Sequence, residues 1–256
     1  MKSAHFVWAI NISTLLILSL VSCTSNMKLQ KKQSENTRRV GEAYLAEEKY
    51  VEAYRELLKA KEIYPRDPNI YYDMGILYYK KGKFDKAIGQ YKKALEIKPD
   101  FAKALNNLGV AYLAQKNWDA AIDCFNKLVD NDNYETPHFP VFLLGRAYYN
   151  KKEYTLAEKY FQETLKIDPG YIFALQWLGR TYTAMGRVDE AVKTLEKAVE
   201  LSPKFLKLYF DLAEAYKLSF DYKKALNAYN KVIELAPESP LAIKAEKEAE
   251  NIKISG

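Results

Sequence analysis

The fold is decided by residues 68–100, PNIYYDMGILYYKKGKFDKAIGQYKKALEIKPD, which contain two helical patterns separated by a glycine. Asp67 can cap the first helix and Pro68 can open it, because proline lacks only an N–H that would be unpaired there. Gly82 permits a left-handed residue between the helices. We expect the second helix to run from about Phe84 to Ile97, where a proline two residues later ends it. The stretch therefore predicts a helix–turn–helix unit.

This unit recurs along the chain with a period close to 34 residues. A glycine recurs at steps of 34, 34, 36 and 34, and an alanine takes its place in the last unit: Gly41, Gly75, Gly109, Gly145, Gly179 and Ala213. A tyrosine follows three residues after each: Tyr44, Tyr78, Tyr112, Tyr148, Tyr182 and Tyr216. An alanine follows twelve residues after each: Ala53, Ala87, Ala121, Ala157, Ala191 and Ala225. Prolines close five of the six units: Pro65, Pro99, Pro169, Pro203 and Pro237.

The repeated small residues have a packing explanation. Gly75 and Ala87 are expected where the two helices of one unit cross closely, because a longer side chain would push the helices apart. Tyr78 and Tyr91 are expected to fill the space beside that crossing. We therefore assign these positions to structure and not to chemistry.

The pattern is similar to that of the tetratricopeptide-repeat proteins. The resemblance implies an all-α superhelix, an α-solenoid, of six helix-turn-helix units followed by a C-terminal capping helix, because a single unit cannot bury its apolar face alone. The expected units are 34–67, 68–101, 102–137, 138–171, 172–205 and 206–239. Residues 240–256 are expected to form the capping helix and a short tail.

The N-terminus has the features of an export signal. Lys2 precedes an apolar run from Phe6 to Ser22, which is interrupted by polar residues. A membrane-spanning helix needs about 20 apolar residues. We therefore expect residues 1–22 to be a signal peptide, and the alternative is an uncleaved membrane anchor.

The residues Leu20-Val21-Ser22-Cys23 resemble a bacterial lipobox, where a diacylglyceryl group joins the cysteine thiol before cleavage. The chemistry needs cysteine, because its thiolate is the nucleophile. The resemblance implies acyl chains such as palmitate on Cys23. Thr24, in place of an aspartate, implies the periplasmic face of the outer membrane, although the inner membrane stays open. Residues 23–33 show no apolar period and are expected to form a flexible tether.

Composition and charge exclude several classes of function. Of the 256 residues, 48% are hydrophobic and 28% are charged, which is typical of a globular protein. The formal charge of +6 is a mild excess. Lysine pairs such as Lys80-Lys81 and Lys223-Lys224 stand among acids, whereas nucleic-acid binders concentrate basic charge on one face. We expect solvated surface and no nucleic-acid partner.

No residue pattern indicates catalysis. His138 is the one histidine beyond the signal peptide, and no Cys or His cluster has the spacing of a metal site. A nucleophile pair of Cys124 and His138 can be imagined, but nothing in the sequence orients it. More simply, Cys124 is a small apolar residue on a helix. We therefore expect no enzyme, no metal, no cofactor and no small-molecule substrate.

Function is instead expected in a surface. In this architecture the first helix of each unit lines a concave groove, and tyrosine, tryptophan and arginine there are the residue types that dominate interface energy. The expected groove residues are Tyr72, Ile76, Tyr79, Asn106, Val110, Leu113, Phe142, Arg146, Tyr149, Phe173, Gln176, Trp177 and Arg180. The alternative is that some of these rings, and Phe139 above all, pack between helices.

The expected partner is a protein segment. Some repeat proteins of this class grip the C-terminal carboxylate of chaperones with Lys at the fifth and Asn at the ninth position of a unit. No unit here combines the two, so this mode is disfavoured. A helical or extended apolar segment fits the expected groove better.

The third unit carries a two-residue insertion ending in Tyr134-Glu135-Thr136-Pro137, followed by Leu144-Gly145. Thr136 is expected to cap the next helix and Pro137 to open it. Together with the lipobox and the six units, this stretch is similar to the type IV pilus biogenesis lipoproteins, the pilotin-like PilF, PilW and Tgl family. The resemblance implies binding to secretin subunits and help with their membrane insertion and ring assembly. An alternative is a lipoprotein adaptor that docks cell-wall hydrolases or other periplasmic complexes.

Overall fold

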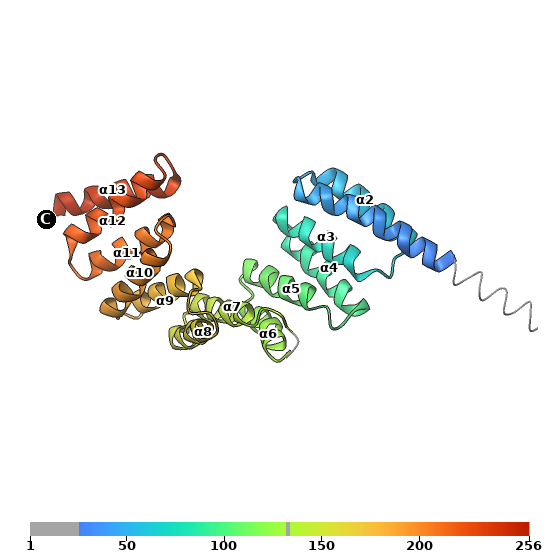
Figure 1. The fold of residues 1–256 in the computed structure, drawn as a ribbon, viewed down its shortest axis with the longest axis horizontal. Helices are drawn as coiled ribbons and strands as arrows, with labels where there is room; N and C mark the ends of the chain where they lie inside the picture. The colour runs from blue at the N-terminus through green and yellow to red at the C-terminus, as the bar shows by residue number, and fades with distance from the viewer. Residues whose placement is uncertain (1–25, 132–133, 256) are drawn as a thin grey trace, which may run out of the picture. The chain divides into compact units, whose positions relative to one another are not determined.

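The computed structural model describes residues 26–131 and 134–255, and every regular element in these ranges is an α-helix (Figure 1). This confirms the all-α fold class. The chain divides into two compact units, one ending at Ala111 and one beginning at Tyr112. The expected signal peptide and the lipidated Cys23 lie outside the described residues.

The first unit consists of a long N-terminal helix and the helix pairs that follow it. Its helices are residues 26–46, α2 (Tyr50–Ile63), α3 (Pro68–Lys80), α4 (Phe84–Ile97) and most of α5 (Ala102–Ala114). Leu45, Leu57, Ile70 and Met74 form part of its hydrophobic core.

The predicted capping of α3 is confirmed. The carboxylate of Asp67 accepts a hydrogen bond of 2.9 Å from the backbone N–H of Asn69, and Pro68 is the first helical residue. Gly82 has a φ of +67° in the turn before α4, which begins at Phe84. The sequence therefore sets both the start of this helix pair and its turn.

The expected tether is wrong for residues 26–33, which form the beginning of the first helix. Most of these residues are strong helix formers (Met, Lys, Leu and Gln). The helix is already held further along, where the Ser34 hydroxyl donates to the Ala60 carbonyl at 2.7 Å and Leu45 is buried. Extending an existing helix costs far less than nucleating one. Exposed residues therefore continue the helix without burying anything.

The second unit continues the alternation of helices. Its helices are α6 (Trp118–Val129), α7 (His138–Asn150), α8 (Tyr154–Ile167), α9 (Ile172–Ala184), α10 (Val188–Leu201), α11 (Leu206–Leu218), α12 (Tyr222–Leu235) and α13 (Pro240–Ser255). α7 packs on α8, α9 on α10 and α11 on α12, and α13 covers α12. The two-helix pattern thus gives local pairs that stack along the chain.

Close helix crossings explain the recurring glycine. A Cβ atom built on Gly75 would lie 2.4 Å from the ring of Tyr91. The equivalent atom on Gly145 would lie 2.6 Å from the ring of Phe161. These distances are far below van der Waals contact, so the glycine admits a large side chain from the partner helix. This confirms the structural role assigned to the glycine.

The expected cap of α7 is wrong. The helix begins at His138 with Pro137 as the N-cap residue, and no side chain makes a capping hydrogen bond. Thr136 lies one residue too early for its hydroxyl to serve as the cap. Its carbonyl oxygen instead accepts a hydrogen bond of 3.0 Å from the backbone N–H of Phe139.

The final helix, α13, has one buried and one exposed face. The Ser239 hydroxyl accepts a hydrogen bond of 3.1 Å from the backbone N–H of Ala242, which caps the helix start. Ala242, Ala245, Ala249 and Ile252 are buried, while the opposite face carries exposed lysine and glutamate. This is the arrangement that a terminal repeat needs for solubility.

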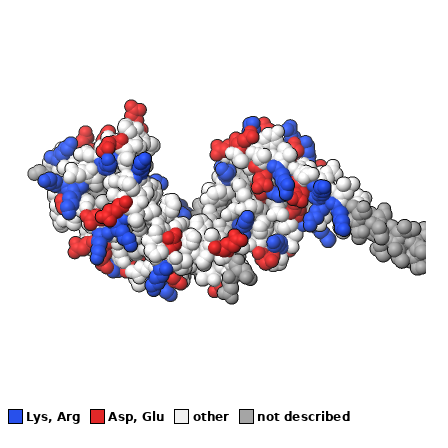
Figure 2. Space-filling view, viewed as in Figure 1, with Lys and Arg blue, Asp and Glu red and all other residues white. Residues whose placement is uncertain are grey.

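Acidic and basic side chains are interspersed on the visible face of both units (Figure 2). None of the described helices combines the length and the apolar character needed to cross a membrane.

Candidate protein-binding site

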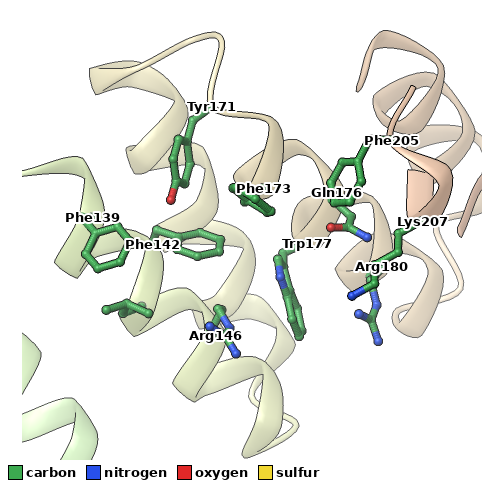
Figure 3. A pocket seen from close by; sticks show the side chains of 11 residues that line it. Phe139, Phe142, Arg146, Tyr171, Phe173, Gln176, Trp177, Arg180, Phe205 and Lys207 are labelled. Carbon is green, nitrogen blue, oxygen red and sulfur yellow. The ribbon is translucent and has the colours of Figure 1, made fainter. Parts of the chain in front are cut away.

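A pocket of about 350 Å³ lies in the second unit, on the side formed by α7, α9 and the start of α11 (Figure 3). Its lining combines aromatic rings with cationic side chains. The lining residues are Phe139, Phe142, Leu143, Arg146, Tyr171, Phe173, Gln176, Trp177, Arg180, Phe205 and Lys207.

Helical spacing brings most of these side chains together. Residues three, four and seven apart lie on one face of a helix. Phe139, Phe142 and Arg146 share such a face on α7, and Phe173, Trp177 and Arg180 share one on α9. Since α7 and α9 contact each other, the two faces form one surface.

The apolar part of the pocket is a chain of ring contacts. The Phe142 and Tyr171 rings lie 5.2 Å apart between centroids, Tyr171 and Phe173 5.9 Å, and Phe173 and Phe205 5.7 Å. These are the offset and edge-to-face separations that aromatic pairs prefer. Phe142 is almost buried, whereas Phe173 is 49% exposed. Phe173 therefore offers a large apolar surface to a partner.

The cationic part is an arginine–tryptophan cluster, which we define as Arg146, Trp177 and Arg180. Trp177 lies between the two arginines (Figure 3). The guanidinium carbon of Arg180 is 4.5 Å from the Trp177 ring centroid, and that of Arg146 is 5.2 Å away. Tyr149 adds an edge-to-face contact of 5.1 Å with Trp177 and lies 5.7 Å from the Arg180 guanidinium. Cation–π contacts thus hold both arginines in place.

A buried carboxylate supports the pocket from α11. Gln176 donates a hydrogen bond of 2.7 Å to Asp211, and Arg180 Nε is 4.0 Å from the other Asp211 oxygen. Burial raises the pKa of Asp211, and the hydrogen bond from Gln176 and the charge of Arg180 oppose that shift. Gln176 is only 5% exposed, so its main contact is with Asp211 rather than with solvent.

Side-chain hydrogen bonds at the equivalent positions also join consecutive repeats in the first unit. Arg38 donates to Asp73 at 2.6 Å, and Asn107 donates to the Tyr72 hydroxyl at 3.3 Å. Each pair, like Gln176 and Asp211, is separated by 35 residues. The fifth position of one repeat therefore contacts the sixth position of the next, and we call these contacts the polar ladder. Burial outweighs the attraction of Arg38 and raises the pKa of Asp73 to about 6.

The structure brings together six of the expected groove residues in this pocket, and they are Phe142, Arg146, Phe173, Gln176, Trp177 and Arg180. Tyr149 contacts Trp177 beside it. Leu113 is buried.

The other expected groove residues belong to the first unit, and they are Tyr72, Ile76, Tyr79, Asn106 and Val110. Tyr72 packs against Phe101 at a centroid distance of 5.2 Å, and Tyr79 packs against Phe84 at 5.4 Å. Both rings are partly buried, so their assignment to the groove stays a prediction.

The prediction omitted Leu143, Tyr171, Phe205 and Lys207, which also line the pocket. Tyr171 and Phe205 stand 34 residues apart, each at the last position of a repeat, and Phe101 holds the same position earlier. An aromatic residue just before the first helix of a unit was thus a readable signal. Lys207 had no comparable signal.

The imagined Cys124 and His138 pair gains no support. Cys124 is buried in α6. His138 begins α7 and packs against the Tyr171 ring at 5.2 Å. Within residues 26–131 and 134–255, no group of His, Cys, Asp and Glu could hold a metal ion.

Stacked helix pairs that present rings and cations in a pocket define a repeat scaffold for protein interaction. Family models described as TPR repeat match residues 41–82 and 77–116, and models described as tetratricopeptide repeat match residues 102–132, 141–171 and 171–238. The chain therefore belongs to the tetratricopeptide-repeat family.

Two solved structures have a similar fold. The first is PilW, a widely conserved type IV pilus biogenesis factor, with a TM-score of 0.76 and 21% identity over 82% of this chain and 97% of that chain. The second is PilF of Pseudomonas aeruginosa, with a TM-score of 0.71 and 18% identity over 86% of this chain and 99% of that chain.

A curated relative matches in sequence over a shorter range. Hsp70-Hsp90 organizing protein 3 of Arabidopsis thaliana is 27% identical over 95 residues, which are 37% of this chain and 17% of that protein. The chain thus spans less than a fifth of the length of this relative.

Proposed function

We propose that this protein is an outer-membrane lipoprotein that binds secretin subunits and assists their membrane insertion and assembly for type IV pilus biogenesis. The pocket of aromatic and cationic residues in the second unit is the observation that carries the proposal. The lipobox at Cys23 and the likeness in fold to PilW and PilF support the choice of partner and membrane.

The mechanism follows from the surface and the anchor. A secretin subunit carries apolar segments that must stay out of water until the ring buries them. The half-exposed Phe173 and the rings around it can cover such a segment, because burial of apolar area is the main driving force of association. Acyl chains on Cys23 keep the scaffold at the membrane, which raises the effective concentration of both partners there.

The first test combines capture with a secretin assay. Full-length protein carrying Phe173→Ala or Trp177→Ala is expressed in place of the native chain, and heat-resistant secretin multimers and membrane pull-downs are compared. Phe173→Ala is informative because the Phe173 ring is 49% exposed and can contact a partner directly. We expect both variants to lower the captured secretin and the multimers severalfold, since aromatic residues at interface centres carry most of the binding energy.

Phe220→Ala is the matched control, because Phe220 is 77% exposed and lies outside the pocket. This variant should leave the amounts of captured secretin and of secretin multimers unchanged. Normal multimers in both pocket variants would reject the proposal. Capture of cell-wall hydrolases in place of secretin would favour the adaptor function.

A further inference from the structure

We propose that the arginine–tryptophan cluster recognises a carboxylate, so that the bound segment carries an Asp or Glu next to a large apolar side chain. This inference rests on the proposed function, because it names the chemistry of the segment that the same pocket binds.

The geometry of the cluster suits a carboxylate. Arg146 and Arg180 pack on the same indole, at 5.2 and 4.5 Å from its centroid. An arginine that stacks uses the face of its planar guanidinium, and the N–H groups at the edge match the two oxygens of a carboxylate. Stacking also removes rotamer freedom before the partner arrives, which lowers the entropic cost of binding.

The charge of the pocket is one-sided. Arg146, Arg180 and Lys207 line it, and no Asp or Glu of the described chain is among the lining residues. Asp211 lies behind this lining, where one of its oxygens is 4.0 Å from Arg180 Nε and the other accepts the hydrogen bond from Gln176. A lining with three cationic side chains and no described acidic one favours a negative partner.

The apolar half of the pocket requires a second feature in the partner. Phe142, Tyr171, Phe173 and Phe205 form a continuous run of rings beside the cations. A lone anion would leave these rings in water, whereas a segment with an acidic residue and an aromatic or aliphatic neighbour would cover both halves. A peptide segment therefore fits better than a free phosphate or a lipid headgroup.

The test uses four nine-residue peptides with blocked ends and the central sequences Phe-Glu-Leu, Phe-Gln-Leu, Phe-Lys-Leu and Ser-Glu-Ser. Binding to the full-length protein is measured by calorimetry at low salt. We expect the Glu peptide to bind about tenfold more tightly than the Gln peptide, because charge-assisted hydrogen bonds to a carboxylate are stronger than those to a neutral amide. The Lys and Ser peptides should bind more weakly still.

The variants separate charge from fold. Arg146→Gln with Arg180→Gln should reduce the Glu-to-Gln affinity ratio to about one while Gln-peptide binding persists, because only the charge-assisted bonds are lost. Arg146→Lys with Arg180→Lys keeps the charge, removes the planar fork and should retain part of the ratio. Lys159→Gln replaces an exposed residue of α8 outside the pocket and should leave the Glu-to-Gln affinity ratio unchanged. Thermal unfolding of each variant checks that the fold is intact.

Equal affinity for the Glu and Gln peptides, or no binding of any peptide, would overturn the inference. Full displacement of the Glu peptide by millimolar inorganic phosphate would also overturn it, because the site would then be a general anion site. If the native protein binds the Glu and Gln peptides equally while Phe173→Ala still lowers secretin multimers, carboxylate recognition fails and the proposed function stands. If the native protein prefers the Glu peptide while the pocket variants leave secretin multimers normal, carboxylate recognition stands and the proposed function fails.

Discussion

At the scale of single residues, glycine 145 shows how one atom limits helix packing. Replacing Gly145 by alanine would place a methyl group 2.6 Å from the Phe161 ring, which is itself fully buried. We expect Gly145→Ala to lower the free energy of unfolding by about 1–3 kcal/mol, the usual cost of overpacking. Urea denaturation followed by circular dichroism measures this change.

Gly89 provides the matched control for that substitution. It also lies within a helix, α4, but a Cβ atom there would meet nothing within 4 Å. Gly89→Ala should stabilise the protein by about 0.5–1 kcal/mol, because alanine is the better helix former. Equal effects of the two substitutions would contradict the close-crossing explanation.

Asp73 makes stability depend on pH. Its pKa is raised by burial to about 6, above the ordinary value of 3.8, despite the attraction of Arg38. A carboxyl group whose pKa is raised by folding stabilises the folded state at low pH, and this contribution is lost as pH rises through the folded pKa. The unfolding free energy of the native chain, relative to Asp73→Asn, should therefore fall by up to about 3 kcal/mol between pH 4 and pH 7.

Urea titrations of both proteins at four pH values measure that difference. Asparagine cannot ionise, so other carboxylates cancel in the comparison. A difference that grows with pH would mean that the ion pair with Arg38 outweighs the cost of burial.

At the scale of helices, the start of the N-terminal helix shows that residues can be helical without packing against the core. Residues 26–33 are helical although all are exposed, so they contribute no burial. Lys31→Pro should abolish helix in this segment and leave the melting temperature within about 2 °C of the native value, because no core contact is lost. Circular dichroism at 222 nm and a thermal melt give both quantities.

Lys59→Pro is the matched control, since Lys59 is also exposed but lies inside α2, whose Leu57 and Ala60 are buried. We expect this substitution to unfold the repeat. A large loss of melting temperature in Lys31→Pro would show that the N-terminal turns support the repeats.

The helices themselves were predictable because their signals are local. Asp67, Pro68 and Gly82 each act within a few residues, and they mark the start and turn of one helix pair correctly. The helix of residues 26–33 was not predicted because these residues have no apolar pattern. They extend a helix that is held by later residues, and neither the 34-residue repeat nor a buried side chain marks such an extension. Thr136 was predicted to be the N-cap of α7 from its residue type. The helix begins one residue later than expected, so that Pro137 takes the N-cap position.

The pocket was predictable in part. Arg146, Trp177 and Arg180 followed from the 34-residue period, since the same face of each first helix recurs. Gln176 was expected to contact a partner protein, but it donates a hydrogen bond to Asp211 as part of the polar ladder. Such a contact joins residues 35 apart and depends on how two helices lie side by side, which a single repeat does not reveal.

At the scale of the whole molecule, the proposed lipid anchor on Cys23 would determine the membrane at which the scaffold works. We expect Cys23→Ser to release the protein from membranes and to abolish incorporation of labelled palmitate, because the thiolate is the acceptor of the lipid. Fractionation of cells with and without the substitution measures both effects. Cys124→Ser is the control, since that thiol is buried in α6, and it should change neither. Membrane retention of the Cys23→Ser protein without palmitate would contradict lipid anchoring.

The exposed start of the first helix has a mechanical consequence. Eight helical residues, 26–33, precede the first buried position and extend about 12 Å at 1.5 Å per residue. A stiff rod of this length transmits rotation, whereas a random coil would absorb it. A rotation applied at residue 26 would therefore reach the first repeat, so that the helix and this repeat change orientation together.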